Sequence, residues 1–576
     1  MAADSDSAGT AVKFGPVVGR HGNILPTLLG RLVRRFVFRS VLSAYGEEPC
    51  PTAISFGDAT CAVYFDEFVS LVCSPWISAA CHGDWWKIML PQLARSNIYL
   101  YHAAISVGAL SKWHQRAAHT DAAPRPLLPA PGSAAEMESD PHYLRAIAHY
   151  CQALRLQRKG ASTTDALFLS ILLVCFETLR GNNKTALAHV NHGLALLLSV
   201  VSDVGPGERM GAALAPNPRP VLGAVADIFV NLAGQARSVL PGRLAEGAPF
   251  PNFTKGLRKK KQTIESFMIT LSELPHCSVT VDNVPEVFTS LDQFEQYWLA
   301  LGRKQVNVSA VLMEVVRSSG MLSVNATDDL NNFYQNLLGN QRITEICEEL
   351  TALMLTLGNA FTPLFNSIIM TEGVHSPLYF RALYLRLQFI ASYLFQNPSF
   401  YLRVEYLQAQ TPYFREYLTM AQLALRAVRR EIKHPAQQLS LQCLMSSHLL
   451  LVAFFCREPL AREEALNLLE DYPVQDGVWN VRSLYQLGVR NRDVERRNTL
   501  EGSPTAQWER LRRREYLFEE GGTRVIFRFM DNVDDLGAWE LVEEAGELSE
   551  DQKHMRWTRQ PLTGSGRLLM VDLVNV

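Results

Sequence analysis

The sequence lacks any pair of cysteines at the spacing of a structural zinc site. It has ten cysteines, and the closest two, Cys73 and Cys81, are eight positions apart. Structural zinc sites take two thiolates from one tight turn, usually as C-x2-C, and this pattern does not occur. We therefore expect no zinc finger, ribbon or knuckle and no bound metal. The low cysteine density also argues against a disulfide scaffold, and we interpret the cysteines as small buried side chains.

An excess of charge and a long apolar run are also lacking. Lys and Arg number 55 against 57 Asp and Glu, a net charge of -2, which gives no global attraction to nucleic acid or membrane. The longest apolar run, 166–176, is well short of the ~20 residues that cross a bilayer. The first residues include Asp4 and Asp6 and no apolar segment, unlike a secretory signal peptide. We expect an intracellular protein without a transmembrane segment.

Catalytic motifs are absent as well. There is no H-E-x-x-H, no G-x-S-x-G, no Walker loop and no G-x-G-x-x-G. His189 and His192 lie three apart without a third ligand nearby, so we interpret them as packed or solvated histidines. The acidic pairs 328–329 and 534–535 lack a third carboxylate at helical spacing, which a magnesium-diphosphate site on facing helices would need. The sequence predicts no catalytic residues, no cofactor and no enzymatic activity.

Helical periodicity, in contrast, is abundant. Tyr143, Ile147, Tyr150 and Leu154 recur at steps of four, three and four, which lines one face of a helix that packs on a core. A second helix is predicted to begin after the cap residues 162–165 and to stop at 181–182, and a third covers 186–200. Because the joints between them are short, the three helices should be antiparallel neighbours. We predict an all-α fold of antiparallel packed helices.

Turn-rich gaps divide the chain into five predicted segments. These are a basic, partly ordered N-terminal arm (1–55), a helical region (56–240), a basic linker (241–262), a C-terminal helical region of the same domain (263–520) and an irregular tail (521–576). Within the C-terminal region, helices are predicted at 290–318, 330–358, 377–396, 411–432, 435–456, 460–470 and 505–519.

The N-terminal arm is the first of two basic segments. Residues 7–46 contain no acidic residue, and the stretch 24–36 can form an amphipathic basic helix in an arm whose arginines include those from Arg31 to Arg39. Such a helix fits an anionic membrane surface, an organelle presequence or a partner protein, and Pro26 weakens the presequence interpretation. A docked or poorly ordered arm is the simplest alternative.

The second basic segment lies in the predicted linker. Four consecutive cations fit a nuclear-import signal, and a solvated loop is the alternative. The import candidates are Arg258, Lys259, Lys260 and Lys261.

Several short motifs recur in a recognisable order. A Trp pair at 85–86 is followed by a stretch with His102-Ala103-Ala104 and Gly108-Ala109-Leu110; then come CFETLRGN at 175–182 and Gly193. Near the C-terminus stand FCREP at 455–459, REEA at 462–465 and DGVW at 476–479. In order and spacing, these motifs resemble the middle homology region of fungal transcription regulators of the six-cysteine binuclear zinc-cluster class, over roughly 56–515.

The resemblance implies an all-helical regulatory domain. We interpret its landmark residues, such as Gly108, Glu177 and Arg180, as packing elements, with the latter two as a local ion pair. Family members normally carry C-x2-C-x6-C twice before this region, where six thiolates bind two zinc ions. Here the first cysteine is Cys50 and no such pair exists. We therefore expect weak or no direct DNA binding by this chain.

The function that the resemblance implies is regulation of transcription. We expect a transcription-regulator-like protein of fungal type that acts in the nucleus, with the cytoplasm as a further location, and that controls a secondary-metabolite gene cluster. Its expected partners are proteins: the transcription machinery, a DNA-binding regulator or a second copy in a homodimer. The alternative is a helical scaffold or adaptor that binds a peptide or a small metabolite outside transcription.

Overall fold

The computed structural model of the protein describes most of the chain after residue 53. The described residues are 54–74, 77, 82–120, 140–202, 218–243, 279–318, 335, 339–396, 402–432, 434–441, 444–473, 475–498, 503–532, 539–563 and 569. All of them lie in one compact unit, Ile54–Val576. The basic stretch 31–39 and the cluster 258–261 lie outside the described residues.

The apolar stripe predicted after residue 140 is the buried face of α7 (Pro141–Gln157). Tyr143 and Tyr150 are buried, and Ile147 and Leu154 pack partly buried against the same core. The side chain of Asp140 caps the helix by accepting hydrogen bonds from the first backbone N–H groups. The predicted orientation of this helix is confirmed.

The next helix is the most buried of this region. α8 (Thr163–Leu179) begins after Ser162, whose Oγ accepts a hydrogen bond from the backbone N–H of Asp165 at 3.1 Å, as the cap motif predicted. Every residue from 166 to 179 is buried, so the apolar run is a central core helix. α9 (Asn183–Ser202) follows after a turn in which Gly181 has a φ of 75°.

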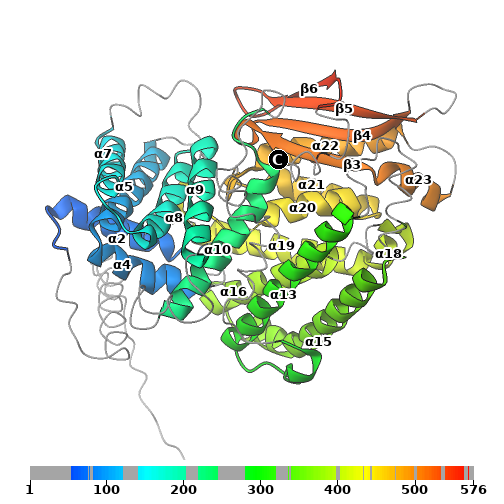
Figure 1. The fold of residues 1–576 in the computed structure, drawn as a ribbon, viewed down its shortest axis with the longest axis horizontal. Helices are drawn as coiled ribbons and strands as arrows, with labels where there is room; N and C mark the ends of the chain where they lie inside the picture. Colours follow the sequence, from blue (N-terminus) through cyan, green and yellow to red (C-terminus); the bar gives the residue numbers. More distant parts are fainter. Residues whose placement is uncertain are drawn as a thin grey trace, which may run out of the picture. The chain divides into compact units, whose positions relative to one another are not determined.

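Other helices surround α8 in this region (Figure 1), where it packs against α5 and α9. They are α2 (Ala59–Val72), the π-helix η1 (Trp85–Met89), α4 (Leu90–Ser96), α5 (Ile98–Thr120) and α10 (Pro218–Ser238).

The C-terminal region is also mainly helical. Four predicted helices, 290–318, 377–396, 411–432 and 460–470, agree with the structure to within one residue. The elements are the 3-10 turn η3 (Val281–Asn283), α13 (Leu291–Ser318), α15 (Gln341–Thr371), α16 (Pro377–Gln396), α18 (Val404–Ala409), α19 (Thr411–Glu431), the 3-10 turn η5 (Pro435–Gln438), α20 (Met445–Phe455), α21 (Pro459–Glu470), the two-stranded pair β1 (Gln475–Asp476) and β2 (Trp479–Asn480), α22 (Val481–Arg497) and α23 (Pro504–Leu511).

α15 is the one described helix that is long and apolar enough, by length and composition, to cross a membrane. Its buried residues, however, recur at steps of three and four, as in a helix that packs on a protein core. Phe361 stacks on Phe294 of α13 with the ring centroids 3.8 Å apart, and Gly358 lies against the ring of Phe389 of α16. α15 is therefore only weak support for a membrane span.

The prediction of an irregular tail over 521–576 is wrong where the chain forms strands. The chain forms an antiparallel sheet of four strands in the order β3-β4-β5-β6, and its first strand takes the place of the last residues of the helix predicted at 505–519 (Figure 1). The strands are β3 (Arg514–Glu519), β4 (Arg524–Asn532), β5 (Trp539–Leu548) and β6 (Met555–Gln560), with the 3-10 turn η6 (Glu520–Gly522) between the first two. The main body is all-α as predicted, and the sheet is its one larger β element among the described residues.

One hydrophobic core joins the regions. The main cluster of buried residues extends from Cys61 on α2 to Met555 on β6 and includes α8, α15 and α20. The side of the sheet that carries Phe527 and Phe529 packs into this core, next to α22 and α23. The helical region 56–240 and the later helices therefore share their buried surface.

Candidate functional site

Three of the sequence candidates lie outside the described residues. They are the import cluster Arg258 to Lys261 and the acidic pairs 328–329 and 534–535. The fourth, the pair His189 and His192, is on α9. Nε2 of His189 lies 3.0 Å from the hydroxyl of Tyr150, and burial lowers the pKa of His189 to about 4. The described residues contain no group of three metal-ligating side chains.

Two landmark glycines bring helices into close contact. A Cβ at Gly108 would lie 1.8 Å from the carbonyl oxygen of Tyr64, so α5 packs directly on the backbone of α2. A Cβ at Gly193 would lie 2.3 Å from the ring of Phe229 on α10 and 2.7 Å from the hydroxyl of Ser170 on α8. Both positions support the interpretation as packing elements.

The CFETLRGN landmark at the end of α8 forms a buried polar cluster. Glu177 and Arg180 form the predicted ion pair, three residues apart, with 3.8 Å between Oε2 and Nη1. Nε of Arg180 donates to the hydroxyl of Tyr143 at 3.1 Å, which joins α8 to α7. Burial raises the pKa of Glu177, and Tyr150 and Arg180 act in the opposite direction. Every group of the cluster serves helix packing.

The DGVW landmark caps a helix at a distance. Asp476 is buried and accepts hydrogen bonds from the backbone N–H and the hydroxyl of Ser446, at 3.0 and 2.9 Å, in the first turn of α20. The positive end of the helix dipole therefore faces this carboxylate. The next residue, Gly477, has a φ of 62° and lies against the amide of Gln235 on α10. A side chain at Gly477 would be strained and would clash with Gln235.

A polar junction connects the helical region 56–240 to the C-terminal segments. Nδ2 of Asn183, at the start of α9, donates to the carbonyl of Gly521 at 3.2 Å, and Nε2 of Gln475 donates to Oδ1 of Asn183 at 2.5 Å. Oε1 of Gln235 accepts from the backbone N–H of Val478 at 3.1 Å. These amides fix β1, β2 and η6 against α9 and α10. We call this group of contacts the junction.

A small, partly open space of about 10 Å3 lies beside the junction, between the end of α8, η5 and β1. Among the described residues, Oγ1 of Thr178 and Oε1 of Gln475, both in its wall, have no hydrogen-bond partner. The space is smaller than the roughly 300–1,000 Å3 of ordinary ligand pockets. It suits water bound to the two orphan oxygens rather than a substrate.

The sheet carries two rows of alternating charge on the face turned away from the helical core. The strand register places a carboxylate, an arginine and a second carboxylate side by side on β3, β4 and β5 in each row. Opposite charges directly across from each other stabilise a sheet. The rows are Glu519, Arg524, Glu547 and Arg556, and Glu515, Arg528, Glu543 and Gln560.

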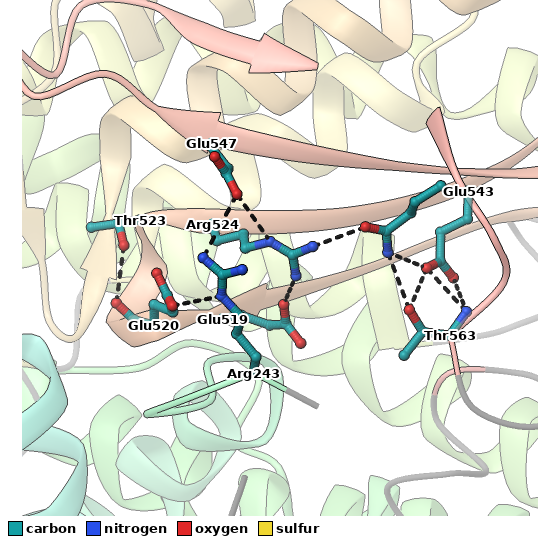
Figure 2. Close-up of polar contacts among 9 residues, drawn as sticks. Arg243, Glu519, Glu520, Thr523, Arg524, Glu543, Glu547 and Thr563 are labelled. Atoms are coloured by element: carbon teal, nitrogen blue, oxygen red, sulfur yellow. Dashed lines mark hydrogen bonds and ion pairs between the residues drawn. The ribbon is translucent and has the colours of Figure 1, made fainter. Parts of the chain in front are cut away.

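Figure 2 shows how one row continues onto the helical body. Arg524 forms ion pairs with Glu519 and, at 3.7 Å, with Glu547. Arg243, from the segment after α10, contacts Glu547 at 3.7 Å and Glu520 at 2.7 Å. The backbone N–H of Leu240 also donates to the carbonyl of Phe518 at 2.7 Å. The segment after α10 is thus bonded to the edge strand β3.

The other row is covered by the end of the chain. The side chains of Arg528 and Glu543 are completely buried and form an ion pair. Glu543 accepts hydrogen bonds from the backbone N–H of Thr563 at 3.0 Å (Figure 2) and from Nε2 of Gln560 at 2.6 Å. Burial alone would raise the pKa of Glu543, but these donors and Arg528 hold it below its usual range. Leu569 completes a second apolar cluster on this face.

The chemistry of these polar groups is structural. Each arginine in the two rows of the sheet is paired with a carboxylate or bonded to a backbone carbonyl, apart from Arg556 at the exposed edge. The hydroxyl of Thr563 donates to the carboxylate of Glu543, and both side chains are buried and bonded within the sheet. These polar contacts join the helical region 56–240 to the later helices and to the sheet.

Sequence reasoning missed the sheet and its polar rows. One signal for it was present: Val525, Phe527 and Phe529 alternate with polar or outward-facing residues, the period of a strand. In the sequence, the adjacent Glu543 and Glu544 belong to an acidic stretch, which does not indicate a strand. In the sheet they face opposite sides, Glu543 toward Arg528 and Glu544 toward Arg490 of α22 at 2.6 Å.

A comparison with known proteins finds a family match for part of the chain. Residues 62–217 match the family model described as fungal specific transcription factor domain. Searches of curated proteins and of solved structures returned no match. The late landmarks at 455–479 lie beyond the matched residues. The match supports a transcription-regulator-like role, and it agrees with the resemblance seen in the motifs: residues 62–217 are similar to the fungal specific transcription factor domain.

Proposed function

We propose that this protein regulates transcription in the nucleus through protein partners, and that its targets form a secondary-metabolite gene cluster. The observation that carries the proposal is the match of residues 62–217 to the fungal specific transcription factor domain. The landmark residues of that domain pack helices together here, and the described residues present no catalytic arrangement. Both facts favour a regulatory protein over an enzyme.

Protein partners are favoured over direct contact with DNA. The net charge is -2, and the described arginines of the C-terminal region are largely engaged with carboxylates of the same chain. A protein binds DNA when its Lys and Arg side chains neutralise backbone phosphates and displace the counterions of the DNA. Arginines that are already paired with carboxylates are less available for this. We propose that the chain reaches promoters through a DNA-binding regulator or the transcription machinery, with a homodimer as one form of assembly.

Localisation of a fluorescent fusion tests the nuclear part of the proposal. Changing Arg258, Lys259, Lys260 and Lys261 together to Ala should move the fusion out of the nucleus without lowering the melting temperature of the protein, because an import receptor reads exposed cations. The matched control changes four cations of the N-terminal arm to Ala, namely Arg31, Arg34, Arg35 and Arg39. We expect this control to stay nuclear.

Two outcomes would count against the nuclear role. An intact fusion that decorates mitochondria or membranes would assign the arm a targeting or surface-binding function instead. An intact fusion that is confined to the cytoplasm would favour the alternative, a helical scaffold or adaptor that works outside transcription.

A further inference from the structure

A single carboxylate in the C-terminal region faces three arginines. Glu495 on α22 accepts hydrogen bonds at Oε2 from Nη2 of Arg457 at 2.9 Å and from Nη1 of Arg462 at 2.7 Å. Nη1 of Arg514 forms an ion pair with Oε1 of the same side chain. The arginines come from the turn after α20, from α21 and from β3, and two of them belong to the FCREP and REEA motifs. We call these four residues the arginine cluster.

The arginine cluster is largely withdrawn from water. The side chains of Glu495 and Arg514 are 7% and 4% exposed, and those of Arg457 and Arg462 are 15% and 14% exposed. The buried ring of Trp508 lies under two of them, with its centroid 4.7 Å from Cζ of Arg457 and 5.2 Å from Cζ of Arg514. Charges in such surroundings are poorly screened and need partners.

The charges of the arginine cluster do not balance. Among the described residues, Arg457, Arg462 and Arg514 each form an ion pair with Glu495 and with no other carboxylate. Three positive charges therefore share one negative charge, which leaves an excess of two. Burial and the other two guanidinium groups lower the pKa of Arg514 to about 10, although Glu495 acts against them.

Two donors of the arginine cluster are also unused. Nη2 of Arg462 and Nη2 of Arg514 are buried and have no hydrogen-bond partner among the described residues. Buried donors in folded proteins are almost always bonded to a protein group, a water or an ion. Water would satisfy these N–H groups but would leave the positive charge in place. An anion satisfies both requirements.

We propose that Arg457, Arg462 and Arg514 form a binding site for a phosphate group. Planar guanidinium groups match the oxygens of an oxyanion and bind them through charge-assisted hydrogen bonds. A phosphate group carries about 1.5 to 2 negative charges at pH 7, close to the excess of the arginine cluster. Glu495 holds the three guanidinium groups from one side, and the free Nη2 groups of Arg462 and Arg514 donate to the phosphate oxygens.

The first test measures phosphate on the purified full-length chain. Protein prepared in phosphate-free buffer is denatured, and the released phosphate is quantified. Equilibrium dialysis with labelled inorganic phosphate follows, with chloride at the same ionic strength as the control. We expect one phosphate per chain, either released or bound with saturation. Released organic phosphate identifies a phosphorylated compound as the source, and released or bound inorganic phosphate identifies the free ion.

Variants separate a phosphate site from a purely structural network. Arg462→Gln should weaken phosphate binding by at least about tenfold, the effect of losing one charge-assisted hydrogen bond. Arg492→Gln is the matched control, because Arg492 lies one turn away on α22 and pairs with Glu463 at 3.0 Å. Its phosphate affinity should be unchanged. Glu495→Gln should lower the melting temperature, and phosphate should restore part of the loss.

The proposal is overturned if the intact protein neither releases nor binds phosphate. It is also overturned if phosphate binds equally well to the Arg462→Gln variant. A third contradictory result has Glu495→Gln lowering the melting temperature with no rescue by phosphate. The counter-charge would then come from the chain itself.

Discussion

At Gly108 a missing side chain sets the distance between two helices. Because a Cβ there would lie 1.8 Å from the carbonyl oxygen of Tyr64, Gly108→Ala must push α5 away from α2. We expect a loss of about 1–3 kcal/mol in the free energy of unfolding, as for other overpacked cores. Gly234→Ala on α10 is the control, because a Cβ at Gly234 would meet no atom within 4 Å and the variant should gain up to about 1 kcal/mol. Urea denaturation compares the variants, and an unchanged midpoint for Gly108→Ala would contradict the close contact.

A buried histidine makes the stability depend on pH. Burial lowers the pKa of His114 to about 4, and its Nε2 lies 2.9 Å from the carbonyl oxygen of Leu179. In the unfolded chain the pKa is about 6.5, so below that pH the unfolded state binds more protons and the free energy of unfolding falls. The loss begins near pH 6.5, is complete near pH 4 and is on the order of 1 kcal/mol per pH unit between them. Urea midpoints from pH 7 to 5 measure the slope. His114→Gln should reduce it, and an equal slope would contradict this origin.

Residue roles could be predicted only where both partners lie close in the sequence. Glu177 and Arg180 are one helical turn apart, so their ion pair followed from spacing alone. Asp476 caps α20 through Ser446, thirty positions away, and the charge excess around Glu495 needs three distant segments. Such contacts depend on the tertiary fold, which periodicity does not specify.

Among the elements, helices were predictable and strands were not. The helix predicted at 377–396 is present with the same bounds, because its apolar residues follow the helical period. The strands β4 and β5 contain Arg and Glu at buried positions on the face away from the helical core, and these charges hide a period-two pattern in a single sequence. In the sheet these charges lie opposite one another on one face, and their mutual pairing makes their burial possible.

The last described residue of the tail anchors it on the sheet. Leu569 is 2% exposed and packs with Leu240, Leu517 and Ile526 on the face that carries the charged rows. Leu569→Ala should therefore cost about 2–5 kcal/mol of the free energy of unfolding. Leu562→Ala in the same tail is the control, since Leu562 is 38% exposed and should lose much less. Thermal or urea denaturation compares them, and equal losses would mean that Leu569 does not fill a core position.

At the scale of the whole molecule, the region 62–217, which matches the fungal specific transcription factor domain, is not isolated. Its helices share the main hydrophobic core with the later helices and with one face of the sheet. Asn183 bonds this region to η6, and Gln235 and Arg243, in and after the helix α10 that follows it, bond to the β1–β2 segment and to the sheet. We therefore expect the described regions to act on a partner as one unit.

The most direct test of the regulatory role brings the chain to a promoter artificially. The full-length protein is fused to an unrelated DNA-binding domain, and a reporter with the matching sites is measured against the DNA-binding domain alone. A fusion of the Gly108→Ala variant, at equal protein level, reports whether the packed domain is needed. We predict that the intact fusion changes reporter expression several-fold and that the variant changes it less. A folded, nuclear fusion that leaves the reporter unchanged would contradict a role in transcription.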